Sequence, residues 1–446
     1  MMTIEDFGRV LRARKTTSEQ ITNECLARID ADNRRINAFI LVMADEARAQ
    51  ARELDRELAA GKDRGPLHGV PISIKDLFDI RGAATTAASR VREGHVADRD
   101  ATAIARLRQA GAVFVGKTNL HEFAFGTTNE DSAFGPARNP IDPTRSPGGS
   151  SGGSAASLAA GMALATMGTC TGGSIRIPAA ACGTVGLKPT FGEIPTDGVV
   201  PLSRTMDHAG PLTQTVGDAA LVYEALIGEP RKTPPAAVPV RGLRVGVLRR
   251  YFCDLLEDEV REHFEGALER LRAAGVTFDE IEIRNAGDLG TIYLHIVLAD
   301  AAAYHAATLE SMPEKYTKNV RLRLEMGRYV LAEDYVRALA GREMLRREVD
   351  AALGAHDALI LPTLPIPAPL IGADTVQIAG KAEPVRNVML RLTQLFNVTG
   401  HPAIALPSGT TKAGLPCSVQ LVGNRMATDA LLRVALACEP HISPRS

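Results

Sequence analysis

Residues 70–80 read VPISIKDLFDI, and residues 112–118 read AVFVGKT. Both are short runs rich in apolar and β-branched side chains, which is typical of buried β-strands. Residues 102–110, between them, carry apolar side chains at helical spacing. Because strands alternate with a helix, the stretch predicts an α/β sheet.

The rest of the chain divides into segments that differ in composition and in predicted secondary structure. Residues 1–62 are predicted to be a helical segment, and residues 63–230 a core in which strands and helices alternate. Residues 228–242, GEPRKTPPAAVPVRG, are rich in proline and charge and are the best candidate linker. Residues 231–355 are predicted to be a variable α/β segment. In residues 356–446, the apolar stretches HPAIALP and SVQLVG are expected to rejoin the first sheet.

Composition restricts the classes of partner. The 446 residues have a formal net charge of -1, and 23% of them are charged. A chain without a broad electrostatic field is not expected to bind nucleic acid or an anionic membrane. Its first residues lack the apolar core of a signal peptide, and its six cysteines are scattered as in a reduced protein. We therefore predict a cytoplasmic protein.

Residues 111–118, GAVFVGKT, match the pattern of a nucleotide-binding phosphate loop. A phosphate loop needs a strand before its first glycine and an exposed turn between its glycines. Here the four intervening residues, AVFV, form the predicted strand themselves. We therefore expect Lys117 to end a buried strand instead of binding phosphate.

Residues 147–154, PGGSSGGS, match the serine-hydrolase nucleophile pattern GxSxG around Ser150 and around Ser151. That pattern requires a strand that runs directly into the serine. The preceding NPIDPTRSP contains three prolines and is not expected to form an interior strand. A structured loop ahead of an Ala-rich helix is the better interpretation.

Residues 168–178, GTCTGGSIRIP, place a hydroxyl directly after two glycines. The backbone N–H groups of Thr171, Gly172, Gly173 and Ser174 could point together at a ligand, as an oxyanion hole requires. A plain glycine turn at a helix end explains the same letters. Serine also needs a base to act as a nucleophile.

The ten histidines include no metal-binding spacing such as HExxH. Lys75 is a candidate base, because it follows the alternating apolar residues Val70, Ile72 and Ile74. Taken alone, such a lysine is more often a surface residue. If it is buried, its amine can be neutral at rest and accept a proton.

Together, the motifs GVPISIK, GGSSGG and GGSIRIP are far more specific than any one of them. Ser150 follows Lys75 by 75 residues, and Ser174 follows Ser150 by 24. The combination resembles the amidase signature family, and the resemblance extends over residues 65–215 and 358–438. It implies a single large domain with a mixed, twisted central β-sheet that helices cover on both faces.

The resemblance also implies a Ser-Ser-Lys triad and an amidohydrolase that acts on a linear carboxamide. Ser174 would be the nucleophile, Ser150 the bridging residue after a cis peptide bond, and Lys75 the base. The N–H groups of residues 171–174 would form the oxyanion hole. The expected partners are a small amide and water, with no metal or organic cofactor, and a homodimer is possible.

Ser151, Cys170 and Arg176 are predicted to surround the triad. Relatives commonly have Asp where this chain has Cys170, and that carboxylate is expected to brace the loop, in part through Arg176. Cys170 cannot supply this charge, so the partner of Arg176 is open. Cys170 is also a possible rival nucleophile, although a packed thiol is the preferred interpretation.

Two other functions stay open at this point. The same family includes the glutaminase-type component of tRNA-dependent amidotransferases, which works with ATP and with a partner subunit. A non-catalytic or nucleotide-binding module is the third alternative. Residues lining the substrate pocket are expected near Tyr304, Tyr316, Arg321 or Arg323 and in the loop before Leu395.

Overall fold

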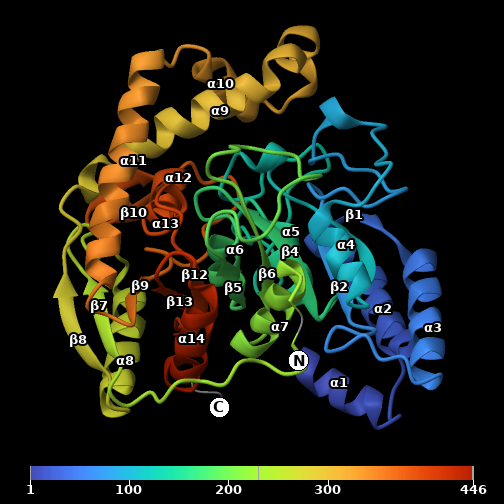
Figure 1. The fold of residues 1–446 in the computed structure, drawn as a ribbon. Helices are drawn as coiled ribbons and strands as arrows, with labels where there is room; N and C mark the ends of the chain where they lie inside the picture. The colour runs from blue at the N-terminus through green and yellow to red at the C-terminus, as the bar shows by residue number, and fades with distance from the viewer. Residues whose placement is uncertain (1, 230, 444–446) are drawn as a thin grey trace.

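The computed structural model describes residues 2–229 and 231–443 (Figure 1). The strands are β1 (Phe39–Val42), β2 (Pro71–Lys75), β3 (Val113–Thr118), β4 (Ala165–Cys170), β5 (Val185–Lys188), β6 (His208–Thr213), β7 (Arg244–Leu248), β8 (Thr277–Ile281), β9 (Ala358–Pro362), β10 (Thr375–Ile378), β11 (Lys381–Pro384), β12 (Ala403–Thr410) and β13 (Pro416–Val422). The helices are α1 (Ile4–Arg12), α2 (Ser18–Ile36), α3 (Ala44–Ala59), α4 (Thr102–Gln109), α5 (Gly152–Ala159), α6 (Arg176–Cys182), α7 (Val216–Ile227), α8 (Asp258–Ala273), α9 (Leu289–Ser311), α10 (Lys318–Gly327), α11 (Ala332–Leu353), α12 (Val385–Leu390), α13 (Gln394–Val398) and α14 (Thr428–Ile442).

Eleven strands form one mixed sheet in the order β1-β3-β2-β4-β6-β5-β12-β13-β9-β7-β8. β2 lies between β3 and β4 and is parallel to both. β12 pairs with β5 in the antiparallel direction, so the C-terminal part of the chain rejoins the sheet as expected. Because the sheet includes strands from the core, the middle and the C-terminal segments, the chain forms one α/β domain.

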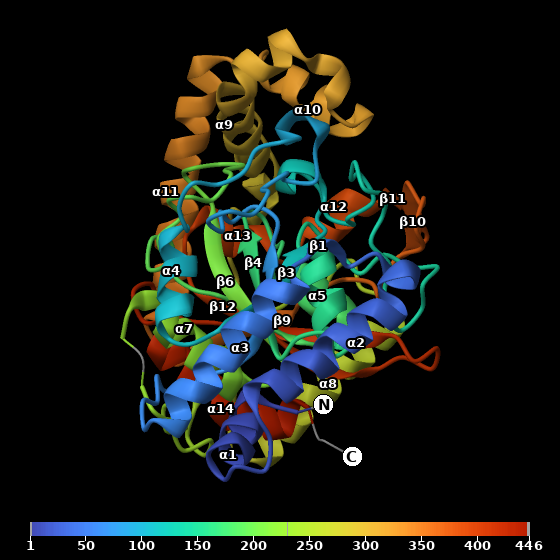
Figure 2. The same cartoon turned by 90° about the vertical axis from the view of Figure 1, so that its right-hand side faces the viewer.

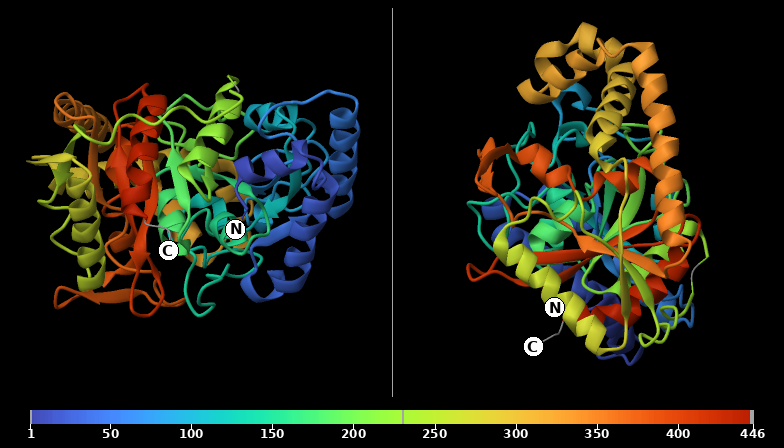
Figure 3. Two further views of the ribbon diagram at one scale, coloured as in Figure 1. Left: turned by 90° about the horizontal axis from the view of Figure 1, so that it is seen from below. Right: turned by 90° about the vertical axis from the view of Figure 1, so that its left-hand side faces the viewer.

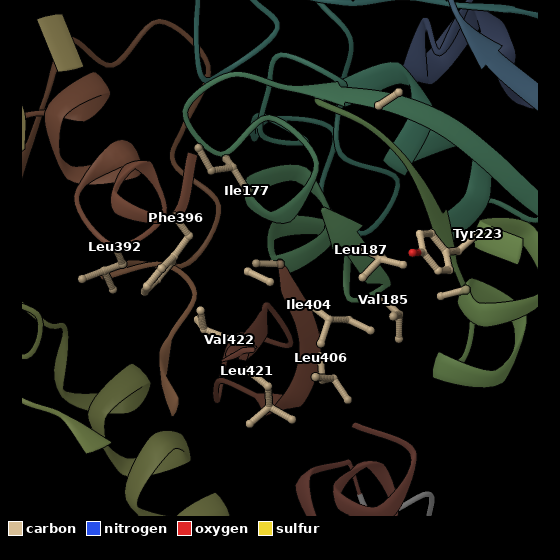
Figure 4. Close-up of a cluster of buried hydrophobic side chains, with 14 of the residues drawn as sticks. Ile177, Val185, Leu187, Tyr223, Leu392, Phe396, Ile404, Leu406, Leu421 and Val422 are labelled. Carbon is tan, nitrogen blue, oxygen red and sulfur yellow. The ribbon is translucent and has the colours of Figure 1, made fainter. Parts of the chain in front are cut away.

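Helices cover both faces of the sheet, as the alternation of side chains in β5 and β12 shows. Gly186 and Ala405 face α6, where a side chain on Gly186 would collide with Ala179. Their neighbours Leu187 and Ile404 point to the opposite face and join the large core there (Figure 4). On that face, α14 contacts β12 and also the neighbouring helices α7 and α8. Helices therefore cover the apolar side chains on both faces of β5 and β12.

The helical prediction for the first 62 residues is wrong in one place. α1, α2 and α3 form, but residues 39–42, FILV, form β1 at the edge of the sheet. α2 ends because Asn37 adopts the left-handed conformation, with a φ of 50°, and turns the chain. The four aromatic and branched residues then pair with β3, which Phe39 meets at Thr118.

Helices α9, α10 and α11 project from the sheet as one group (Figures 1 and 2). The right-hand view in Figure 3 shows α9 and α10 beyond one end of the strands, whereas α11 runs back toward the sheet and contacts β9. Glu122, in the loop after β3, accepts hydrogen bonds from the backbone and the hydroxyl of Thr317, just ahead of α10, at 2.7 and 2.6 Å. The projection is therefore tied to the loop that follows the core strands.

Candidate active site

Lys75 is the last residue of β2, and its side chain is fully buried. Its amine donates hydrogen bonds to Ser150 Oγ at 2.8 Å, Ser151 Oγ at 2.8 Å and Thr169 Oγ1 at 2.7 Å. Burial lowers the pKa of Lys75 from 10.5 to about 7, although the negative charge of nearby Asp207 partly opposes this shift. Near neutral pH the amine is thus available to accept a proton from a hydroxyl.

The sheet brings these groups together. β2 and β4 are parallel neighbours, so Lys75 and Thr169 both lie at the carboxyl ends of these strands. Sheets of α/β proteins commonly carry their sites at this end. The loop before α5 places Ser150 there, and the Gly149–Ser150 peptide bond is cis, as the resemblance implies. A side chain on Gly149 would lie 2.8 Å from the backbone of Thr128, so only glycine permits this approach.

Ser174 lies in the turn between β4 and α6 and is 6% exposed. Its carbonyl accepts a hydrogen bond from Ser151 N at 3.3 Å, which fixes the turn beside the serine loop. Among the described residues, no hydrogen bond joins the Ser174 hydroxyl to Ser150. In the structure, the Lys75 amine contacts Ser150 and Ser151 directly, and Ser174 is joined to this group only by the hydrogen bond between its carbonyl and Ser151 N.

The glycines of this turn are required by its surroundings. A side chain on Gly173 would collide with the Thr393 hydroxyl, which donates a hydrogen bond to the Gly172 carbonyl at 2.8 Å. Within the described part of the chain, no acceptor is paired with the N–H groups of Gly172, Gly173 or Ser174. Unpaired donors in a buried turn are what an oxyanion hole requires.

Asp207 belongs to the site, although no motif in the sequence indicated it. One of its oxygens accepts a hydrogen bond from Thr171 Oγ1 at 2.6 Å, and the other accepts from the backbone of Leu202 and Ser203 at 2.9 and 3.1 Å. Burial raises the pKa of Asp207 to about 6, in spite of these bonds and of Lys75. Thr169 was missed as well, because a threonine within a strand carries no distinguishing pattern.

The partner of Arg176, which the sequence left open, is a set of amide and carbonyl groups. The buried guanidinium donates to Gln420 Oε1 at 2.6 Å, to Asn397 Oδ1 at 2.6 Å and to the Thr393 carbonyl at 2.8 Å. The Cys170 thiol donates to the same Asn397 oxygen at 3.5 Å, and Asn397 donates back to the Cys170 carbonyl at 2.8 Å. Asn397 thus links Arg176 to Cys170 and supports the loop that carries Ser174. Cys170 is a buried thiol that contributes to this support.

The phosphate-loop pattern is structural, as expected. Its central residues form β3, and α4 precedes that strand. Lys117 is buried, and its amine lies 2.8 Å from an Asp76 oxygen and donates to the Ala84 carbonyl at 2.8 Å. A lysine held by these groups is not free to bind phosphate.

The expected pocket residues need correction. Tyr316 packs with Phe123 and His305, and Arg321 forms an exposed ion pair with Glu325 at 2.7 Å. Tyr304 stacks against the edge of His305 and is 39% exposed. None of these three predicted residues borders the Ser174 turn in the described structure.

A pocket of about 400 Å³ is lined by two residues, Tyr293 and Leu390, that lie against Gly172 of this turn. A side chain on Gly172 would lie 2.6 Å from the Tyr293 hydroxyl and 3.0 Å from Leu390, and both residues line the pocket. Gln394, in the region before Leu395, lines it as well, as the sequence led us to expect. The pocket thus draws on the first turns of α9 and on α12, whereas the sequence analysis had named only Tyr304, further along α9, and no residue of α12.

The described residues contain no cluster of three or more His, Cys, Asp or Glu side chains suited to a metal ion.

Residues 286–311, which include α9, are long and apolar enough to span a membrane by composition, and the sequence analysis overlooked them. Half of their most apolar window is buried inside the protein. α9 packs against α10 and α11, which accounts for this composition.

Comparisons with known proteins identify the family of this chain. The model of the family described as Amidase matches residues 20–432. An amidase from Pseudomonas putida is 40% identical, covering 98% of this chain and 95% of that protein. The A component of the glutamyl-tRNA(Gln) amidotransferase from Geobacter metallireducens is 36% identical, covering 98% and 96%.

A solved crystal structure of an amidase matches the fold with a TM-score of 0.94 at 38% identity, covering 99% of this chain and all of that one. Both the sequence and the fold therefore match amidases over nearly the whole chain. The chain belongs to the amidase family, whose members are the amidase signature enzymes, and it is an enzyme that hydrolyses amides.

Proposed function

We propose that this enzyme cleaves a linear carboxamide to a carboxylate and ammonia or an amine through an acyl-Ser174 intermediate. Neutral Lys75 takes the proton of Ser150 while Ser150 takes the proton of Ser174, and Ser174 Oγ forms a bond to the amide carbon. The carbon–nitrogen bond then breaks, and the leaving nitrogen receives the proton through Ser150. Water cleaves the acyl-serine ester by the same relay, which restores the Ser174 hydroxyl.

The observation that carries this proposal is the contact between the Lys75 amine and Ser150 Oγ at 2.8 Å, with both side chains fully buried. Burial holds the pKa of Lys75 near 7, so the base is matched to neutral pH. The hydrogen bond from Ser151 N to the Ser174 carbonyl supports Ser174 as the nucleophile, because it holds the Ser174 turn against the residue that follows Ser150.

The oxyanion that forms on the amide oxygen would rest on the N–H groups of residues 171–174. Loss of one such donor typically reduces turnover by about a hundred- to a thousandfold. Asp207 supports this role, because its hydrogen bond to Thr171 holds the start of the turn. No step of this scheme requires a metal or an organic cofactor.

Ammonia release from simple primary amides by the purified chain tests the proposal. We expect turnover that Ser174→Ala abolishes and that Ser443→Ala, a change far along the chain at the end of α14, leaves intact. Hydrolysis that survives in Ser174→Ala would refute the assignment of the nucleophile. The predicted cytoplasmic location and a homodimer stay predictions.

A second candidate is the glutaminase-type component of a tRNA-dependent amidotransferase. It is favoured by the likeness to the A components of such enzymes, of which one is 37% identical over 99% of this chain. In that case ammonia release would require glutamine and a co-purified partner subunit. Release from simple amides by the isolated chain favours the stand-alone amidase.

A further inference from the structure

The pocket beside the Ser174 turn has a one-sided charge. Its lining includes two arginines, Arg386 and Arg391, and no aspartate or glutamate. Arg391 is occupied, because it stacks over the Tyr251 ring at 4.0 Å and donates to the Tyr251 carbonyl at 2.6 Å. The question is therefore what Arg386 is placed there to bind.

Arg386 has no protein partner among the described residues. No hydrogen bond or ion pair joins its guanidinium to them, and its Nε is buried without an acceptor. Half-buried arginines are usually paired, since a desolvated charge without a counterion is costly. An unpaired guanidinium in a pocket is suited to a ligand that supplies the missing negative charge.

The surroundings of Arg386 increase this excess of positive charge. Arg323 lies close to it, and burial together with Arg386 lowers the pKa of Arg323 to about 10. Arg323 itself is held in place by a hydrogen bond to the Phe125 carbonyl at 2.6 Å. Asp131 opposes this charge from nearby, and its carboxylate also accepts hydrogen bonds from the Asn319 amide at 3.2 and 3.3 Å.

Tyr293 connects this charge to the proposed chemistry. Its hydroxyl lies against Gly172, two residues before Ser174, and makes no hydrogen bond to a described residue. Burial raises the pKa of Tyr293 to about 12, although Arg386 opposes the shift, so the hydroxyl stays protonated and can donate. Arg386 and Tyr293 thus both line the pocket without a hydrogen-bond partner among the described residues, and Tyr293 also lies against Gly172 of the turn.

We propose that this pocket binds a carboxylate carried by the substrate, with Arg386 as its main contact and the Tyr293 hydroxyl as a second donor. The inference rests on the proposed function, and it names the substrate class as amides that also bear an acid group, such as half-amides of short dicarboxylic acids. The planar guanidinium can hold both carboxylate oxygens at once. The carboxamide would then be presented to Ser174.

Paired substrates test the proposal. The half-amides succinamate and glutaramate are compared with the neutral butyramide and valeramide, which have the same chain lengths. We expect Arg386→Gln to raise KM for the half-amides about ten- to a hundredfold and to leave the neutral amides unchanged. Arg386→Lys should recover part of the loss, and Tyr293→Phe should raise KM by a smaller factor. Arg337→Gln, which removes an exposed arginine of α11, is the matched control.

Binding to the inactive Ser174→Ala protein gives a readout that does not depend on turnover. Calorimetry should detect succinamate or glutaramate binding that Arg386→Gln abolishes. Equal kcat/KM for half-amides and neutral amides, together with no half-amide binding, would overturn the inference and leave the proposed amidase intact. Half-amide binding without any hydrolysis by the wild type would instead support the pocket and refute the proposed function.

Discussion

The amine of Lys75 lies 2.8 Å from Ser150 Oγ although 75 residues separate them. This single contact joins the end of a central strand to a loop rich in glycine and proline. The same amine also meets Ser151 and Thr169, so three hydroxyl groups replace the water that a lysine normally binds. The site is therefore arranged to keep a lysine buried and ready to lose its charge.

Lys75→Ala should abolish amide hydrolysis, with a loss of at least about a thousandfold in kcat/KM, because no other base among the described residues hydrogen-bonds to Ser150 Oγ. Ser150→Ala should leave a trace of amide hydrolysis. This change interrupts the proton transfer through Ser150, but Lys75 and the N–H groups of residues 171–174 stay in place. Ammonia release under saturating amide measures both variants. Lys412→Ala, at an exposed lysine, is the control, and near-normal turnover in Lys75→Ala would show that the triad is wrongly assigned.

The activity should depend on pH as expected for a lysine base. Only the neutral amine accepts a proton, so kcat/KM for a neutral amide should fall about tenfold per unit as the pH drops below the Lys75 pKa of about 7. Asp207 raises that pKa, so Asp207→Asn should shift the acid limb to lower pH. A rate that stays flat down to pH 5 in the wild type would contradict a lysine base.

Asn397 should be needed for both stability and turnover. Asn397→Ala removes an acceptor from the buried Arg176 and a donor from the Cys170 carbonyl, which should cost about 2 to 3 kcal/mol of unfolding free energy. The Ser174 turn is then less well supported, so kcat should fall as well. Denaturant unfolding and initial rates measure the two effects, with the exposed Asn424→Ala as control. Unchanged values for Asn397→Ala would mean that Arg176 is braced without this residue.

The sequence identified the parts of the site that have a local pattern and missed the parts that do not. The apolar alternation before Lys75 indicated a buried strand end, and the glycines around Ser150 and Ser174 marked turns where the backbone must approach closely. Asp207 and Asn397 carry no such pattern, because their roles depend on contacts with residues 36 and 221 positions away. Contacts of that range depend on the sheet order, which a single sequence does not contain.

The same reasoning explains the errors about the fold and the pocket. FILV at residues 39–42 is too short to show a period, and only its pairing with β3 makes it a strand. Arg386 belongs to none of the motifs that the sequence analysis used, and its lack of a partner becomes visible only in three dimensions.

The pair of Lys117 and Asp76 should be structural, although Lys117 stands in a phosphate-loop pattern. Lys117→Met leaves the carboxylate of Asp76 buried without its counterion, which should cost about 3 to 5 kcal/mol of unfolding free energy. The double variant Asp76→Asn with Lys117→Met should recover part of this loss, because no unpaired charge remains. ATP with magnesium should leave the melting temperature of the wild type unchanged, whereas a nucleotide site would raise it. If Lys117→Met were as stable as the wild type, the pair would contribute nothing to the fold and the lysine would need another explanation.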